Sequence, residues 1–200
     1  STALAAPIAE VKELPAEKLI AEKAEPEGVT VTTKDITYVE DYVEIAIAYP
    51  IISGLSAAKF QEEVNYFIEK QVTKAKEDIE IQVQEYVEMA KEGGFEIRAH
   101  QLFVDYELKA NNDDFLSFTI TYYTYTGGAN GMTVVNAFNI NKKTNGVFQL
   151  GNLFKDGSNY KETINAEINR QIELRSDGEN EMFFEGEMGF QGISDEQTFY

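Results

Sequence analysis

The chain has 200 residues, no cysteine, and 35 acidic against 17 basic side chains, which gives a formal net charge of -18 at pH 7. Its 43% of hydrophobic residues can form a substantial core, which argues against disorder of the whole chain, and the absence of cysteine excludes a disulfide framework and any thiolate site. An acidic chain without a Lys/Arg cluster is a poor partner for nucleic acid, so the charge serves solubility or attracts a cationic partner.

Residues 1–28 are rich in Ala, Glu, Lys and Pro and have too few apolar side chains to form a core, so we predict a flexible tether. Ala3-Leu4-Ala5 fits the small-x-small pattern of a signal-peptidase site, although chance matches are common in an Ala-rich segment. No stretch of the chain approaches the ~18 apolar residues of a membrane-spanning helix. We expect the chain to be the outer part of an anchored or secreted protein.

Residues 29–94 are expected to form a first module, in which a hairpin precedes a helix. β-branched and aromatic residues alternate with polar ones in residues 29–36 and 42–49, and Glu40-Asp41 between them predicts the turn. Tyr49-Pro50 predicts the end of the second strand, because proline has no backbone donor.

A long helix is predicted after this hairpin. Apolar side chains recur every three or four residues from Phe60 to Ala90, with Ser56 as a candidate N-cap and Gly93-Gly94 as the stop. Such a helix spans on the order of 50 Å. We therefore expect either a kink near residues 78–82 or an end that projects beyond the sheet.

Residues 95–200 are expected to form a second module of sheet plus helix. Strand patterns separated by turn residues fall at residues 95–108, 115–126, 132–141 and 147–150. Asn159, followed three residues later by Glu162, predicts the start of a second, shorter helix that covers the sheet. Thr198-Phe199-Tyr200 has the pattern of a strand that has only begun. The predicted fold class is α+β, with an antiparallel, hairpin-based sheet packed by one long and one shorter helix.

The motifs that carry chemistry are weak in this sequence. The loop Gly127–Gly131 lacks the Lys-Ser/Thr pair of a P-loop, and strand residues follow it instead of a helix. His100 has no second His or Cys to complete a metal site, and Asp113-Asp114 does not match the spacing of a calcium loop. We predict no catalytic residue, no metal site and no cofactor, and hence no enzyme.

The strongest hairpin signal is the segment Tyr122–Asn139, in which two aromatic and β-branched runs flank a Gly-rich turn. Alternation along the first run places aromatic rings on both faces of that strand. Core packing is the usual role of such rings, but tyrosines on a second face also serve as protein-binding anchors or sugar-stacking platforms. Our candidate contact residues are Tyr123, Tyr125, Gly127, Gly128, Asn130 and Gly131.

Two segments resemble a known pair of bacterial extracytoplasmic modules. Tyr49–Leu55, followed by Phe60, Val64, Asn65 and Ile68, is similar to the first module, and Tyr122–Gly131 together with Phe148–Phe154 is similar to the second. This pair forms the outer half of RsiV-type lysozyme-binding anti-sigma factors and precedes the catalytic domain of PdaC-type peptidoglycan deacetylases. The resemblance covers nearly everything after Val29.

The resemblance implies a non-catalytic sensing or binding module outside the cytoplasmic membrane, whose partner is lysozyme or another cationic protein and whose parent protein is membrane-anchored. The alternatives are an accessory peptidoglycan-binding domain of a cell-wall deacetylase and a structural envelope protein without a ligand. The family usually has His where this chain has Asn130, and it continues beyond the equivalent of Tyr200 into closing strands. We therefore expect an exposed sheet edge and concentration-dependent association.

Overall fold

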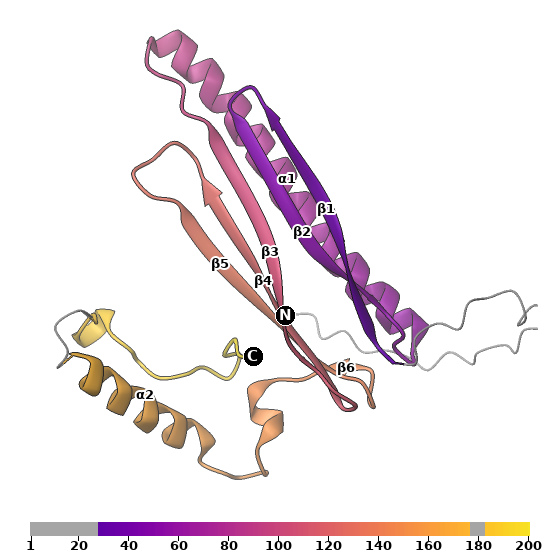
Figure 1. The fold of residues 1–200 in the computed structure, drawn as a ribbon. Coiled ribbons are helices and arrows are strands. Elements are labelled where there is room, and N and C mark those ends of the chain that lie inside the picture. The colour runs from indigo at the N-terminus through magenta and orange to yellow at the C-terminus, as the bar shows by residue number, and fades with distance from the viewer. Residues whose placement is uncertain (1–27, 177–182) are drawn as a thin grey trace, which may run out of the picture. The chain divides into compact units, whose positions relative to one another are not determined.

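The computed structural model describes residues 28–176 and 183–200, so the predicted tether lies outside the described residues, apart from Gly28. The described chain forms two compact units. Residues 28–147 with Tyr200 make up the first, and residues 148–199 make up the second. In the first unit a long helix, α1, runs along one face of a sheet (Figure 1).

The sheet has six strands in the order β1-β2-β3-β4-β5-β6. The strands are β1 (Thr30–Glu40), β2 (Val43–Ser53), β3 (His100–Asn111), β4 (Phe115–Tyr125), β5 (Met132–Asn141) and β6 (Gly146–Val147). The α+β class is confirmed, but the prediction of a purely antiparallel sheet is wrong, because β2 and β3 pair in parallel. The chain leaves β2 through α1, which carries it back along the sheet, so β3 starts at the same end as β2.

Strand β2 continues through Pro50 to Ser53, so the predicted strand end at Tyr49-Pro50 is wrong. Strand β3 accompanies β2 only from Val43 to Ile47. At Pro50, which lies opposite Thr33, the described partner of β2 is β1 alone. A residue without an N–H group is tolerated where a strand is bonded on one side only.

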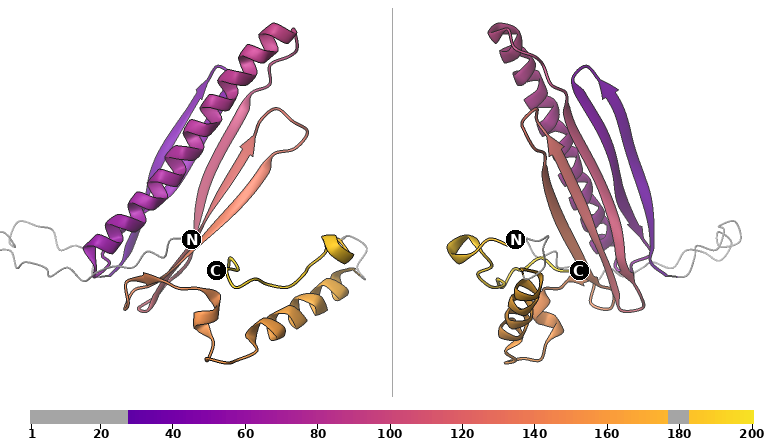
Figure 2. Two further views of the ribbon diagram at one scale, coloured as in Figure 1. Left: turned by 180° about the vertical axis from the view of Figure 1, so that it is seen from behind. Right: turned by 60° about the vertical axis from the view of Figure 1, so that its left-hand side comes forward.

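Helix α1 (Ala58–Gly93) is continuous over 36 residues. The predicted stop is confirmed, because Gly94 adopts the left-handed conformation (φ 66°) that favours glycine. The predicted N-cap is wrong: the cap position is Ala57, and the Ser56 hydroxyl instead lies 3.1 Å from Oδ1 of Asn145 and donates to it. The C-terminal end of the helix extends past the β1–β2 turn, so the projecting end is observed in place of a kink (Figure 2).

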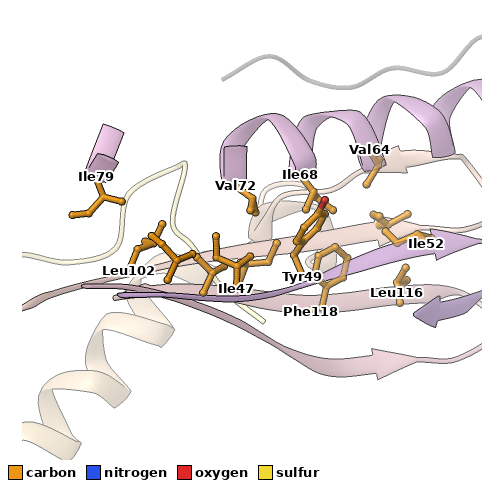
Figure 3. Close-up of a cluster of buried hydrophobic side chains, with 14 of the residues drawn as sticks. Ile47, Tyr49, Ile52, Val64, Ile68, Val72, Ile79, Leu102, Leu116 and Phe118 are labelled. Atoms are coloured by element: carbon orange, nitrogen blue, oxygen red, sulfur yellow. The ribbon is translucent and has the colours of Figure 1, made fainter. Parts of the chain in front are cut away.

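The core of the first unit lies between α1 and the middle of the sheet (Figure 3). The helix contributes a stripe of buried side chains at Phe60, Val64, Ile68, Val72, Ile79, Val83 and Ala90. Fully buried residues of β2, β3 and β4 face it, among them Ile47, Leu102 and Phe118. Asn65 fixes the end of β2, because its side chain accepts from the Ile52 N–H (2.9 Å) and donates to the Ile52 carbonyl (2.8 Å).

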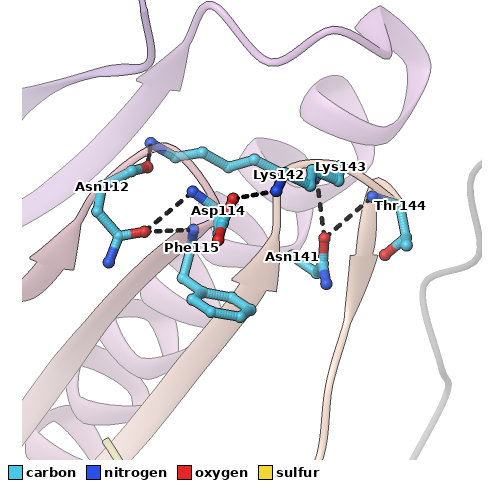
Figure 4. A network of polar contacts seen from close by, with 7 residues as sticks. All are labelled: Asn112, Asp114, Phe115, Asn141, Lys142, Lys143 and Thr144. Carbon is cyan, nitrogen blue, oxygen red and sulfur yellow. Dashed lines mark hydrogen bonds and ion pairs between the residues drawn. The ribbon is translucent and has the colours of Figure 1, made fainter.

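Two asparagines close the turns at one end of the sheet (Figure 4). Oδ1 of Asn112 accepts from the N–H groups of Asp114 (3.0 Å) and Phe115 (2.8 Å) between β3 and β4. Oδ1 of Asn141 accepts from the N–H groups of Lys143 (2.9 Å) and Thr144 (3.0 Å) between β5 and β6. The predicted turns therefore form by side-chain bonds to local backbone.

The second unit contains α2 (Tyr160–Ser176) and two short 3-10 helices, η2 (Leu150–Leu153) and η3 (Gly186–Met188). Helix α2 begins after Asn159, whose amide donates to the Glu162 carboxylate (2.8 Å), so the predicted start is confirmed. None of its side chains is fully buried, and its predicted packing on the sheet stays a prediction. Thr198–Tyr200 forms no strand in the described range 183–200, which corrects the predicted one.

The compact units differ from the predicted modules 29–94 and 95–200. Parallel pairing of β2 with β3 joins the two modules in one sheet, and the boundary between units falls between Val147 and Phe148. The division into two sequence modules stays a prediction.

Candidate functional site

The candidate site is built on β4, whose two faces have different surroundings. Side chains alternate along a strand, and on one face Leu116, Phe118 and Ile120 are fully buried in the core beneath α1. Tyr122 continues this face, and its burial raises the pKa of its phenol to about 12. Tyr123 has the opposite orientation, so it lies on the face turned away from α1, which we call the outer face.

A stacked pair of rings is the centre of the outer face. Phe103 of β3 lies opposite Tyr123 of β4, and their ring centroids are 5.8 Å apart with an angle of 16° between the planes. Both rings are half-buried. Tyr125 lies one step further along the same face and donates from its hydroxyl to the carbonyl of Gly128 (3.0 Å).

Two acidic residues lie on the same face of the sheet as this ring pair. Asp105 follows Phe103 on the outer side of β3. Glu44 of β2 lies opposite Gln101, whose amide donates to the Glu44 carboxylate (2.7 Å). We use the name outer patch for the five residues Phe103, Tyr123, Tyr125, Glu44 and Asp105.

The turn between β4 and β5 is fixed by close contacts. Gly127 adopts a left-handed conformation (φ 83°), and its carbonyl accepts from the Arg98 guanidinium (3.1 Å). A Cβ atom at Gly131 would lie 2.4 Å from the Tyr123 ring, so only glycine allows the ring to lie there. The geometry therefore brings Tyr123, Tyr125 and the glycines together, and their role as contact residues stays a prediction.

Asn130 is separated from that surface. It lines a groove of about 450 Å³ between α1 and the β4–β5 turn. The other lining residues are Ala75, Asp78, Ile79, Gln82, Thr124, Thr126 and Met132. The Asp78 carboxylate forms an ion pair with Lys74, with 2.8 Å between Oδ2 and Nζ. The other lining side chains carry amide, hydroxyl and apolar groups. The sequence grouped Asn130 with the tyrosines, whereas the structure places it with α1.

Residues 36–133, about half of the chain, match the family model described as "Deacetylase PdaC". This segment is similar to the PdaC-type module. The resemblance predicted from the sequence is thereby confirmed for the segment that runs from β1 into β5 and includes the outer patch.

Two crystal structures from the DUF3298 family are similar to the chain. A member from Bacteroides fragilis has 16% identity and a TM-score of 0.52, with 80% of this chain and 72% of that chain covered. A protein from Pseudomonas aeruginosa has 12% identity and a TM-score of 0.45, with 76% and 69% covered. The first similarity supports the fold alone. No curated protein matches the chain.

Residues 28–176 and 183–200 contain no group of three or more His, Asp or Glu side chains that could hold a metal ion. His100 is buried, and its ring lies 5.1 Å from that of Tyr86, which fits the predicted role of an ordinary strand residue. No helix in the described part of the chain has the length and hydropathy needed to span a membrane.

Sequence analysis missed three members of the outer patch: Glu44 of β2, and Phe103 and Asp105 of β3. The alternation in β3 places its two members on the side opposite the buried Leu102 and Val104, so their face could be predicted. Their position beside Tyr123 could not, because it depends on the register between β3 and β4, which also contains a shift between Leu108 and Ala110.

Proposed function

We propose that the chain is a non-catalytic, extracytoplasmic binding module that recognises a cationic protein, with lysozyme as the expected partner, through the outer patch. The observation that supports this is the stacked Phe103–Tyr123 pair with acidic neighbours Glu44 and Asp105. Half-buried aromatic rings make strong anchors in protein interfaces, and their faces attract Lys and Arg side chains. The net charge of -18 steers a cationic partner toward the module.

The biological role follows from the predicted resemblance to RsiV-type anti-sigma factors. In that role, the parent protein is anchored in the membrane, and binding of lysozyme exposes a membrane-proximal segment to proteolysis, which releases a sigma factor. The chain contributes the binding step, and the outer patch supplies its anchors.

The test is a calorimetric titration of the chain with an animal-type lysozyme at low and at moderate salt. We expect 1:1 binding that weakens only partly with salt, because ring contacts persist when charges are screened. If the heat of binding disappears at moderate salt, the interaction is only nonspecific attraction between opposite charges. That result would contradict the proposal.

A pair of variants locates the interface. Tyr123→Ala removes the central ring, and we expect affinity to fall roughly tenfold or more. Tyr66→Ala is the matched control, because Tyr66 is an exposed tyrosine of α1 outside the outer patch. Equal losses from both variants would place the interface elsewhere.

An accessory peptidoglycan-binding domain is the second candidate. The description of the matching family, "Deacetylase PdaC", favours it, and stacked rings such as Phe103 and Tyr123 can hold sugar faces. Titration with soluble peptidoglycan fragments at moderate salt separates the two candidates. Binding of the fragments that Tyr123→Ala abolishes, without binding of lysozyme, would establish the second. Binding of neither would favour a structural envelope role.

A further inference from the structure

Two Asn-Gly pairs occur in the chain, Asn130-Gly131 at the turn between β4 and β5 and Asn145-Gly146 at the turn into β6. Asparagine loses its side-chain amide most readily when glycine follows, because glycine has no side chain to keep its backbone nitrogen away from the preceding amide carbon. Local structure then decides whether the two atoms can meet. The two pairs have the same chemistry, so their surroundings can be compared directly.

Few described contacts hold the pair Asn130-Gly131. The pairing of β4 with β5 ends at Thr124 and Met132, so strand hydrogen bonds do not hold the nitrogen of Gly131. Asn130 is exposed, and no hydrogen bond from the described residues engages its amide. The side-chain bonds that fix this turn reach carbonyls on its β4 side. The amide of Asn130 is therefore able to turn toward the glycine nitrogen.

The pair Asn145-Gly146 is held at both of its residues. Oδ1 of Asn145 accepts from the Ser56 hydroxyl (3.1 Å), and Gly146 pairs with Asn141 as the first residue of β6. The Asn141 side chain also closes the turn that precedes the pair. An amide bonded through its oxygen and a glycine fixed in a strand cannot readily approach each other.

We propose that Asn130 is a site of spontaneous deamidation in the folded chain, whereas Asn145 is protected. The nitrogen of Gly131 attacks the Cγ atom of Asn130, and the bond between Cγ and the amide nitrogen breaks. The proton from Gly131 and the NH₂ group leave together as ammonia, and a cyclic succinimide remains. Water then opens the ring at one carbonyl to give aspartate, or at the other to give isoaspartate, in which the main chain runs through the former side chain.

The products change the surroundings of the outer patch. Both add a negative charge, and isoaspartate also adds a CH₂ group to the main chain ahead of Gly131. A Cβ atom at Gly131 would lie 2.4 Å from the Tyr123 ring, so this glycine has no room to shift toward the ring. A longer main chain therefore displaces the turn or the ring. The expected effect on a partner rests on the proposed function, whereas the modification itself does not.

The first experiment follows peptide masses while the full chain is incubated at mildly alkaline pH. Cleavage at Lys142 and Lys143 places the two asparagines in different peptides. We expect the peptide with Asn130 to show replacement of NH₂ by OH several-fold faster than the peptide with Asn145. In urea, where the chain is unfolded, the two rates should become similar. Equal rates in the folded chain, or a difference that persists unchanged in urea, would overturn the proposal.

The second experiment tests the effect on the partner. Wild type and Asn130→Gln are each titrated with lysozyme before and after the incubation. Glutamine closes the corresponding larger ring much more slowly, so the affinity of the wild type should fall several-fold while Asn130→Gln keeps its own starting value. Equal losses in both proteins would contradict the effect assigned to Asn130. If the fresh wild type does not bind lysozyme, the proposed function fails, and the peptide masses still decide the modification.

Discussion

The two faces of β4 differ in burial, and the proposed function assigns stability to one face and recognition to the other. On the face beneath α1, Phe118 is fully buried and stacks on Phe138 with ring centroids 4.9 Å apart. On the outer face, Tyr123 stacks on Phe103 with ring centroids 5.8 Å apart, and its side chain is only partly buried. The chemistry of the two ring pairs is similar, and their burial differs. The first pair contributes mainly to folding, and the second keeps the accessible surface that the proposed binding function requires.

The most severe test of this difference is Phe118→Ala. It leaves a cavity in the core, and we expect the free energy of unfolding to fall by about 3–5 kcal/mol. Tyr123→Ala on the outer face should cost far less stability, because its ring is only half-buried. Urea denaturation of both variants measures the two losses. Comparable losses would show that the outer pair is also part of the core.

Asn65 tests how α1 holds the sheet on the inner face. Asn65→Ala leaves the N–H and carbonyl of Ile52 without their side-chain partner, and we expect a loss of about 1–3 kcal/mol. Gln71→Ala, at an exposed position of the same helix, should change stability by less than about 0.5 kcal/mol. Thermal unfolding compares the two, and an unchanged midpoint for Asn65→Ala would contradict this role.

Local sequence patterns predicted most elements of the first unit. The three- and four-residue spacing from Phe60 to Ala90 located α1, and Gly94 ended it because its left-handed conformation favours glycine. Alternation located the strands, although β3 begins at His100 and not at Phe95, whose ring packs against Tyr86 (5.9 Å). Periodicity does not show what an end residue will contact, so element bounds were less accurate than element types.

Non-local arrangement was the part that periodicity could not predict. The parallel pairing of β2 and β3 depends on the path of the crossover through α1, and Pro50 is tolerated in β2 only because β3 has already diverged. The same limit applied to the site. Tyr123 and Tyr125 were predicted from their own strand, whereas the approach of Phe103 and the separation of Asn130 follow from strand register and helix position.

The dependence of stability on alkaline pH tests the burial of Tyr122 on the inner face of β4. Burial raises its pKa to about 12 in the folded chain, against a value of about 10 in the unfolded chain. As pH rises, the Tyr122 phenol therefore loses its proton in the unfolded chain before it does so in the folded chain. Its contribution to the free energy of unfolding is complete below pH 10 and is lost as pH rises from 10 to 12. The Tyr122→Phe variant should lose less stability over this window. Equal pH dependence in the two proteins would show that the Tyr122 hydroxyl is not desolvated.

The smallest expected effect concerns the outer face, at the hydroxyl of Tyr125. Tyr125→Phe removes only the hydrogen bond to the Gly128 carbonyl and keeps the ring. That bond is exposed, so we expect a loss of stability of about 0.5 kcal/mol, at the lower end for a hydrogen bond. Faster amide exchange in residues 126–131, measured against Tyr66→Phe, should accompany it. If the outer face is a contact surface, loosening this turn should also weaken lysozyme binding a few-fold, although the core beneath α1 is untouched. Unchanged binding with faster exchange would restrict the contact to the rings and exclude the turn.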